Sequence, residues 1–526
     1  FDYVVSYSRF TRFNYLNVQY LRVCWKYITV YKVVSHKTKL GGGISMRKNF
    51  LTTLAIMFVA FFVATTVAQA ADVTIGGQIL TRWENNEQGT GASPNDFDKA
   101  TDPSDYIVSR IAVNTKVNVN DTTSAFIQMQ SNRTWGSGGN LGAAGAANGS
   151  FQVDDRDTTV GIHQAYFTLK NFASLPVDLK VGRQEIIEDG HRLFGNTIWT
   201  PGKQTHDAVR MDHKHDNLSF TYAWIIAAES GVNVGAELGQ NDIENHLLTG
   251  HYKGILGGNL SVIYNYLEDN CGDNTNCTDD AALENSIHTI GARQAGQLFG
   301  IDYRGEYYYQ WGQADQDATN MGGTNDATGT GIDRSAYMFG VRLGKKFNNV
   351  AMKPSLTFWY DYLSGTSDAD LSGDAKYKSF NTLYDTGHKY YGLMDVFLGV
   401  GTGTKTTGTA GLGLQDLAIK AKLSPMPGWT LKADYHWFST AEGVVGSPGA
   451  GLGASAPANA STVARGQESS ALGNELDLTL VNKYNANTNI AIGFSNYTTT
   501  SAFRTLRAGI VGDGANWAYV QYMVNF

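Results

Sequence analysis

Cationic residues are spread through Val181–Met211, a segment that otherwise carries strand-type and apolar residues. They are Arg183, Arg192, Lys203 and Arg210. Unpaired charge is costly in a soluble core, whereas the inner wall of a transmembrane barrel is wet. The segment is typical of a strand end, a folded-in loop and the start of the next strand.

Most of the chain alternates apolar and polar residues with period two, as strands with two unlike faces do. In Tyr106–Val119, for example, Ile111 and Val113 share one parity, while Arg110 and Asn114 share the other. The same alternation runs through Leu298–Trp311, Asp333–Lys346 and Trp429–Phe438, and the chain ends on the alternating segment Asn516–Phe526.

The connections between these segments alternate in length. Short ones are predicted near residues 120–121, 171–174, 215–217, 257–258, 295–296, 347–350, 424–428 and 484–487. Long ones are predicted at 85–105, 132–157, 186–205, 228–242, 268–284, 312–332, 364–410, 441–471 and 498–515. Short turns on one side and long loops on the other are typical of outer-membrane barrels. We therefore predict an all-β fold, a transmembrane antiparallel barrel of about 18 strands with short periplasmic turns and long extracellular loops.

The N-terminal part divides into two segments before the barrel. Residues 1–45 are basic and tyrosine-rich and end in Gly41-Gly42-Gly43-Ile44-Ser45, so we expect translated upstream sequence that is not native. Residues 46–70 resemble a secretory signal peptide, with Arg47-Lys48, an apolar run and a small-residue cleavage site at Ala68-Gln69-Ala70. The barrel is then predicted to cover 71–526, in the outer membrane of a Gram-negative bacterium and in contact with lipid and lipopolysaccharide.

Two groups of loop residues suggest further chemistry. Cys271 and Cys277 lie six apart in a polar loop, which in an exported protein indicates a local disulfide. Asp368, Asp370 and Asp374 could hold a structural Ca²⁺ through carboxylate oxygens, although such acidic runs are more often simply solvated. No other cofactor is expected. The histidines (His163, His206, His213, His215 and His251) are scattered without a catalytic set, so we do not expect an enzyme.

The strand parity yields candidates for a substrate path. Arg110, Arg210 and Arg304 fall near the middle of their strands on the polar face, and Arg82 and Arg342 share this parity nearer strand ends. Arg183 has the apolar parity, so either Gly182 marks a bulge or Arg183 lies above the membrane. Arg192 belongs to the loop 186–205 and, like Arg183, could instead only pin that loop.

Several motifs resemble the alginate-export family of outer-membrane channels. They are Gly182-Arg183-Gln184, Gly190, Arg192-Leu193, Gly195-Asn196, Trp199 and Asp207-Ala208-Val209-Arg210, followed by Asp361-Tyr362-Leu363-Ser364-Gly365 and Leu472-Gly473-Asn474-Glu475-Leu476-Asp477-Leu478. The resemblance implies a monomeric 18-stranded barrel that passively exports an anionic, alginate-like polysaccharide through an arginine-lined lumen. It also implies a loop 186–205 that folds inward.

Alternatives to polysaccharide export remain open from the sequence. A general or small-anion-selective porin is the first of them, because Asp361, Asp416, Asp434, Glu475 and Asp477 also take the inward parity. A structural or adhesive barrel plugged by its loops is another. From residue 71 onward 32 Lys and Arg face 47 Asp and Glu, a net charge of −15, and no basic stripe suggests nucleic acid. Periplasmic export partners are compatible with the resemblance.

Overall fold

The computed structural model describes residues 72–88, 104–135, 160–228, 243–269, 285–314, 332–367, 370, 376–398, 408–409, 411–444, 469–506 and 512–526. These belong to one compact unit, Ala70–Phe526. The expected upstream segment and signal peptide lie outside the described residues. No described helix is both long and apolar enough to cross a membrane.

The unit is a single sheet of long antiparallel strands, each paired with the next in sequence, plus one two-residue strand, β14 (Lys376–Tyr377), which pairs parallel to β12. The long strands are β1 (Asp72–Asn86), β2 (Ser104–Asn118), β3 (Thr123–Thr134), β4 (Val160–Leu169), β5 (Asp178–Gln184), β6 (His206–His215), β7 (Leu218–Ala228), β8 (Ile243–Ile255), β9 (Gly258–Asp269), β10 (Asn285–Leu298), β11 (Ile301–Ala314), β12 (Ile332–Lys346), β13 (Ser355–Leu363), β15 (Leu414–Leu423), β16 (Trp429–Val444), β17 (Ser469–Lys483), β18 (Thr488–Thr499) and β19 (Gly514–Asn525). Short helical turns are η1 (Phe172–Ser174), η3 (Gly387–Lys389) and α3 (Ser501–Leu506).

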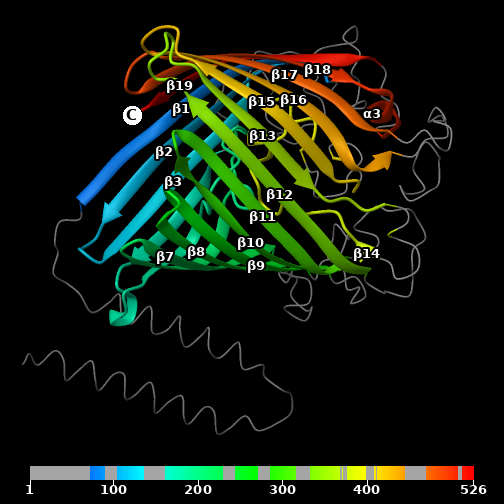
Figure 1. The fold of residues 1–526 in the computed structure, drawn as a ribbon. Coiled ribbons are helices and arrows are strands. Elements are labelled where there is room, and N and C mark those ends of the chain that lie inside the picture. The colour runs from blue at the N-terminus through cyan, green and yellow to red at the C-terminus, as the bar shows by residue number, and fades with distance from the viewer. Residues whose placement is uncertain are drawn as a thin grey trace, which may run out of the picture. The chain divides into compact units, whose positions relative to one another are not determined.

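The sheet closes on itself because the first strand pairs with the last (Figure 1). Gly77 N donates to the Phe526 carbonyl at 2.8 Å, and Phe526 N donates back to the Gly77 carbonyl at 3.0 Å. A Cβ on Gly77 would lie 2.5 Å from the Phe526 ring, so this seam needs glycine there. The predicted closed barrel of 18 spanning strands is confirmed.

The two faces of the wall differ as the parity predicts. Outward positions carry exposed apolar side chains, such as Ile111, Val262 and Phe358, which suit a surface in lipid. Inward positions carry polar and charged groups, among them Arg110, which is 1% exposed although its neighbour Ile111 is 44% exposed.

The connections also follow the predicted order, with one boundary misplaced. The short connection expected near Ala295-Gly296 lies four residues later, at Phe299 and Gly300, while Ala295 and Gly296 remain inside β10. Phe299 (φ 53°) and Gly300 (φ 74°) both adopt the left-handed conformation that a two-residue hairpin turn requires. Glycine is required at position 296 for a different reason, because a Cβ added there would lie 2.7 Å from the Cα of Gly258 on β9.

Two connections fold into the barrel, and we call residues 185–205 and 378–398 the inner plug. They are joined to each other by a parallel bridge between Phe194 and Tyr384. Tyr384 N donates to the Leu193 carbonyl at 2.9 Å, and Gly195 N donates to the Tyr384 carbonyl at 2.8 Å. Apolar side chains of both segments, including Ile186, Phe380 and Phe397, form one buried cluster with inward residues of the wall. The inner plug therefore has a small core of its own inside a charged lumen.

Candidate functional site

Arg192, in the first segment of the inner plug, ties the plug to the barrel wall. Its Nη2 donates to Asp361 Oδ2 at 2.5 Å and to Glu306 Oε1 at 3.0 Å, and its Nη1 donates to Tyr391 Oη at 2.9 Å. The guanidinium also lies 3.7 Å from the ring centre of Tyr390. Burial disfavours the charge, but Asp361, Tyr391 and Glu306 together hold the pKa of Arg192 well above its ordinary value. Arg192 is therefore a cation of the plug anchored by two wall carboxylates.

Further cations surround the same carboxylates. Arg342 lies 3.3 Å from Asp361 and 3.9 Å from Glu306, while Arg293 and Arg304 lie 3.9 and 4.0 Å from Glu306. We call Arg192, Arg293, Arg304, Arg342 and Lys389 the cationic cluster. The nearby acids are Glu306 and Asp361, Asp189, which lies 3.6 Å from Arg293, and Asp385, whose carboxyl interacts with Arg192. Five cationic groups thus face four carboxyl groups, which leaves an excess of positive charge.

The members of the cationic cluster are held close to one another by the plug. A Cβ added to Gly190 would lie 3.0 Å from Arg304 Nη1 and 4.0 Å from Arg293 Nε, so glycine lets these guanidinium groups approach the plug backbone. Lys389, at the end of η3, is exposed. The surrounding protein nevertheless keeps part of the water away from its ammonium group, and this desolvation and the charges of Arg304, Arg293 and Arg192 lower the pKa of Lys389. Mutual repulsion of this kind is relieved when an anion binds.

Several N–H groups of the cluster have no hydrogen-bond partner. They are Arg293 Nε, Arg304 Nη2, and Arg342 Nε and Nη1. The Arg342 guanidinium stacks 3.0 Å from the ring centre of Trp359, which orients it without using its donors. Buried donors are normally satisfied. These donors are buried and unpaired in this state, so a ligand carboxylate reaches them only after a movement that uncovers them.

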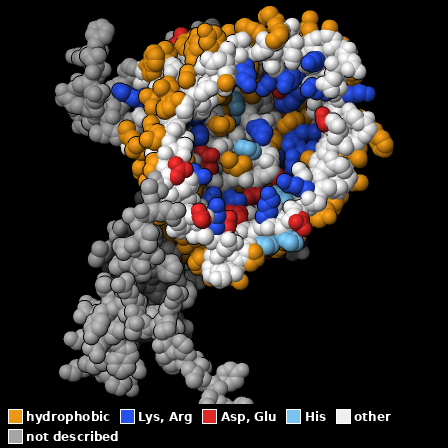
Figure 2. Space-filling model, turned by 90° about the vertical axis from the view of Figure 1, so that its left-hand side faces the viewer, with side chains coloured by type: hydrophobic (Ala, Val, Ile, Leu, Met, Phe, Trp, Pro, Cys, Tyr) orange, Lys and Arg blue, Asp and Glu red, His pale blue; other side chains and the backbone are white. Residues whose placement is uncertain are grey.

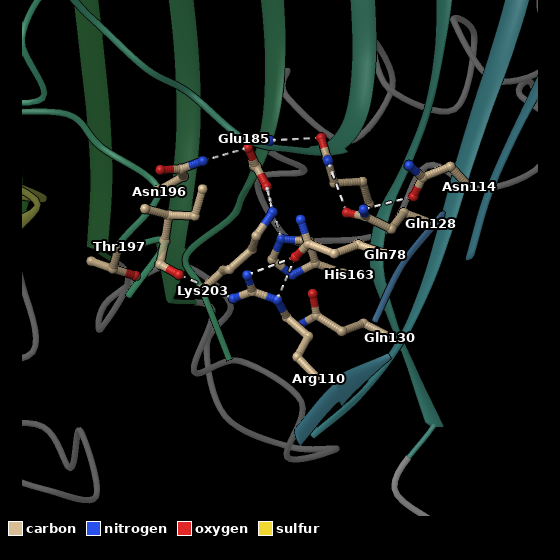
Figure 3. A network of polar contacts seen from close by, with 12 residues as sticks. Gln78, Arg110, Asn114, Gln128, Gln130, His163, Glu185, Asn196, Thr197 and Lys203 are labelled. Carbon is tan, nitrogen blue, oxygen red and sulfur yellow. Dashed lines mark hydrogen bonds and ion pairs between the residues drawn. The ribbon is translucent and has the colours of Figure 1, made fainter. Parts of the chain in front are cut away.

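A second network joins the first plug segment, residues 185–205, to strands β1–β4 (Figure 3). Arg110 Nη2 donates to Gln78 Oε1 at 2.8 Å, and its Nη1 donates to the carbonyl groups of Ile198 and Thr200 at 3.1 and 3.2 Å. Arg110 thus holds the plug backbone, a role that its parity alone could not reveal.

Glu185, the first residue of the plug, is the centre of this network. Lys203 Nζ and Asn196 Nδ2 donate to its carboxylate at 3.0 and 2.8 Å, and His163 Nε2 lies 3.1 Å from it (Figure 3). Burial alone would raise the pKa of Glu185, but the hydrogen bond with His163 and the charge of Lys203 bring it down to about 2. The carboxylate is therefore charged at any physiological pH.

Trp199 joins the plug to the closing strands of the barrel. The Arg82 guanidinium lies 3.5 Å from its ring centre, and Arg82 Nη1 donates to the Trp199 carbonyl at 2.9 Å. Trp517 and Tyr519 on β19 pack edge-on against the same ring, with centroids 5.4 and 5.0 Å away. His388 stacks on it at 4.3 Å. Arg82 is thus on the inner face, but it holds the plug.

Arg183 is not on the inner face, which corrects its inclusion among lumen residues. It pairs across β5 and β6 with Asp207, to which its Nη2 donates at 2.6 Å, and about half of each side chain is exposed. The register runs without a shift from β4 through β6, so Gly182 is not a bulge. Arg210 does face inward, but Asp212 neutralises it at 2.8 Å.

The short-turn end of the lumen carries lysines that the sequence reasoning overlooked. Figure 2 shows this hollowed mouth, with Lys and Arg side chains gathered inside and hydrophobic side chains outside. From the strand registers, the inward lysines of this half, which we call the basic mouth, are Lys116, Lys180, Lys214, Lys253, Lys346, Lys420, Lys422, Lys432 and Lys483. The acids on this part of the wall are fewer: Asp72, Asp178, Asp212, Asp302 and Asp434. The parity that selected the arginines would also have found these lysines.

The structure describes only some of the residues in the remaining loop predictions. Cys271, Cys277, Asp368 and Asp374 lie outside the described residues. Asp370 is described, and its carboxylate accepts hydrogen bonds from Ser367 N at 3.0 Å and from Lys378. Within the described ranges, no three His, Cys, Asp or Glu residues gather as metal ligands would.

A closed barrel with an apolar outer wall and a charged, partly plugged lumen defines the class of protein, an outer-membrane channel. Comparison of the sequence with known families then identifies which one. The alginate export family matches residues 74–508, and the chain belongs to this family. The predicted resemblance is confirmed.

Comparison with solved structures returns other bacterial barrels. OccK11 (OpdR) of Pseudomonas aeruginosa is 12% identical, with 87% of this chain and 97% of that chain covered and a TM-score of 0.46. OpdO of the same organism is 11% identical, with 86% and 97% covered and a TM-score of 0.48. A BenF-like porin from Pseudomonas fluorescens Pf-5 is 10% identical, with 86% and 99% covered and a TM-score of 0.45. The comparison with curated proteins finds no match.

Proposed function

We propose that this channel passively exports an anionic, alginate-like polysaccharide, working as a monomer. The observation that carries the proposal is the cationic cluster, in which Arg293, Arg304 and Arg342 present N–H donors without partners beside the exposed Lys389. A uronate chain carries a carboxylate on each sugar, and a guanidinium can bind each one through two donors.

The basic mouth supports the direction of transport. Its lysines lie at the short-turn end, which faces the periplasm in barrels of this class. A mouth lined with one sign of charge raises the local concentration of an oppositely charged chain. Several weak contacts in series let such a chain slide, whereas one tight site would trap it. The excess of cations in the cluster, moderated by Glu306 and Asp361, fits weak binding.

A porin for small anions is the alternative, and the inner plug favours it. Residues of the plug and of the wall are buried together across much of the lumen. Two openings beside the plug are small: one of about 380 Å³ borders Lys203 and His163, and one of about 350 Å³ borders Asp189 and Arg210. Such spaces suit small solutes unless the plug moves.

Single-channel conductance in planar bilayers tests the proposal. Polyuronate added at the short-turn side should interrupt the current at low salt, and Arg304→Gln with Lys389→Gln should shorten the interruptions several-fold. Arg504→Gln is the matched control, because it removes an arginine that bonds Thr499 and Asp513 rather than a member of the cationic cluster, and it should leave the interruptions unchanged. If polyuronate leaves the wild-type current unaltered while small uronates pass, the channel is a small-anion porin instead.

A further inference from the structure

The inner wall of β8 and β9 holds polar side chains that are buried and have no partner. Asn245 and Asn265 are 0% exposed and Thr249 is 2% exposed. Neither the amide nitrogen nor the amide oxygen of either asparagine makes a hydrogen bond, and Thr249 Oγ1 makes none. These five atoms form what we call the amide patch.

The three residues of the amide patch are neighbours in the sheet and face the same way. Asn265 pairs with Leu247 in the register of β8 and β9, so it lies diagonally between Asn245 and Thr249. All three share the inward parity of His251, which contacts Glu188 of the inner plug at 3.1 Å. The patch therefore points into the lumen, at the level that the plug occupies.

Apolar side chains lie beside the amide patch and offer its amides no hydrogen-bond partners. Leu247, Ala223 and Ile225 are fully buried beside the patch, and they belong to the same cluster as Leu193, Phe194 and Phe380 of the plug. A wall position that is always covered by such a cluster favours an apolar residue, because an unmatched buried amide loses its hydrogen bonds to water. Each such group in a native structure calls for an explanation.

Gln310, on the same band of the wall, shows what a plug-binding amide looks like. It is also 0% exposed, but its Nε2 donates to Thr289 Oγ1 at 3.1 Å and to the Asn381 carbonyl at 2.8 Å, and its Oε1 accepts from Asn381 N at 2.8 Å. Thr289 pairs directly with Asn265 across β9 and β10. Both ends of the Gln310 amide thus bond the plug, whereas Asn265, two strands away, stays unmatched.

We propose that the amide patch is a binding subsite for the hydroxyl groups of the transported sugar chain, covered here by the inner plug and exposed when the plug withdraws. An asparagine side chain both donates and accepts, as a pair of sugar hydroxyls does, and the Thr249 hydroxyl does the same. The subsite deepens the proposed function and rests on it. It supplies neutral contacts beside the charged contacts of the cationic cluster, and salt weakens only the charged ones.

The test separates the two kinds of contact by ionic strength, using the full-length channel in planar bilayers and polyuronate as the probe. The variants are Asn245→Leu with Asn265→Leu, and Asn265→Ala alone in case the double variant does not insert. Asn114→Leu, which removes an inner-wall amide that is bonded to Gln128 at 2.7 Å, is the matched control. In wild type, a residual interruption of the current should persist in 1 M salt, and the patch variants should shorten it at least fivefold.

The outcomes are distinct. At low salt the patch variants should still be interrupted by polyuronate, because the cationic cluster is intact, and their small-ion conductance should match wild type. If wild type shows no residual interruption in 1 M salt, or if the patch variants show one that is equally long, the proposed subsite is overturned. A higher melting temperature of the variants with unchanged interruptions would show that the amides stay covered. If polyuronate does not interrupt the wild-type current at low salt, the proposed function is refuted instead.

Discussion

Replacing Arg192 with methionine is expected to free the inner plug from the wall without unfolding the barrel. The side chain is 1% exposed and bonds Asp361, Glu306 and Tyr391 at 2.5, 3.0 and 2.9 Å. Removing one partner of a buried ion pair costs about 3–5 kcal/mol, because the other charge stays buried. Arg342 remains 3.3 Å from Asp361, so we take the lower end, about 3 kcal/mol.

A change of about 3 kcal/mol shifts the ratio of seated to released plug roughly 100-fold. The strands keep their inter-strand hydrogen bonds, so the barrel should persist while the plug moves. Conductance should rise, and hydrogen exchange of residues 378–398 should quicken. Arg192→Lys should fall between wild type and Arg192→Met, since one ammonium cannot match the planar fork of a guanidinium. Conductance and exchange in Arg192→Met that do not differ from those of wild type and of the Arg504→Gln control would refute the reasoning.

Three further predictions concern pH and covalent structure. The pKa of Glu185 is lowered to about 2, so its carboxylate stabilises the seated plug above the ordinary pKa of 4.5 and loses this effect as the pH falls toward 2. Wild-type conductance should therefore rise as the pH falls through this range. Glu185→Gln should abolish this pH dependence. Burial raises the pKa of Asp385, in the second plug segment, from 3.8 to about 7. Deprotonation of Asp385 therefore destabilises the seated plug progressively as the pH rises between those values. Conductance should rise from pH 4 to 7 in wild type but not in Asp385→Asn. Cys271 and Cys277 should yield a linked peptide by mass spectrometry without reduction, and Cys271→Ser with Cys277→Ser should leave the conductance unchanged.

The wall of the barrel was accessible to sequence reasoning because its alternation is local. Ile111 and Arg110 are adjacent in sequence, and their opposite faces follow from strand geometry alone. The turn at Phe299 and Gly300 was misplaced because a phenylalanine in the left-handed conformation has no sequence signature, whereas Gly296 looks like a turn residue and serves close strand packing.

The site was less accessible because it depends on pairs far apart in sequence. Parity places Arg110 and Arg304 on the inner face, but it cannot show that Arg110 holds the plug backbone at Ile198 while Arg304 keeps a donor without a partner. The link between Arg192 and Asp361 spans 169 positions. No periodic pattern encodes such a contact, since it arises only when a connection folds into the lumen and meets the wall.

The position of Trp199 bears on the order in which the molecule is completed. Its ring contacts Arg82 on the first strand and Trp517 and Tyr519 on the last, so one plug side chain spans the seam from within. The seam cannot form until β19 exists, and by then residues 185–205 and 378–398 have long been synthesised. Closing the ring and seating the plug are thus coupled at one indole ring. A folding intermediate that closes with the plug outside would lack this contact, and its seam would be held by backbone pairing and by direct contacts between the strands, such as those of Trp517 with Glu84 and Gln78 with Asn525.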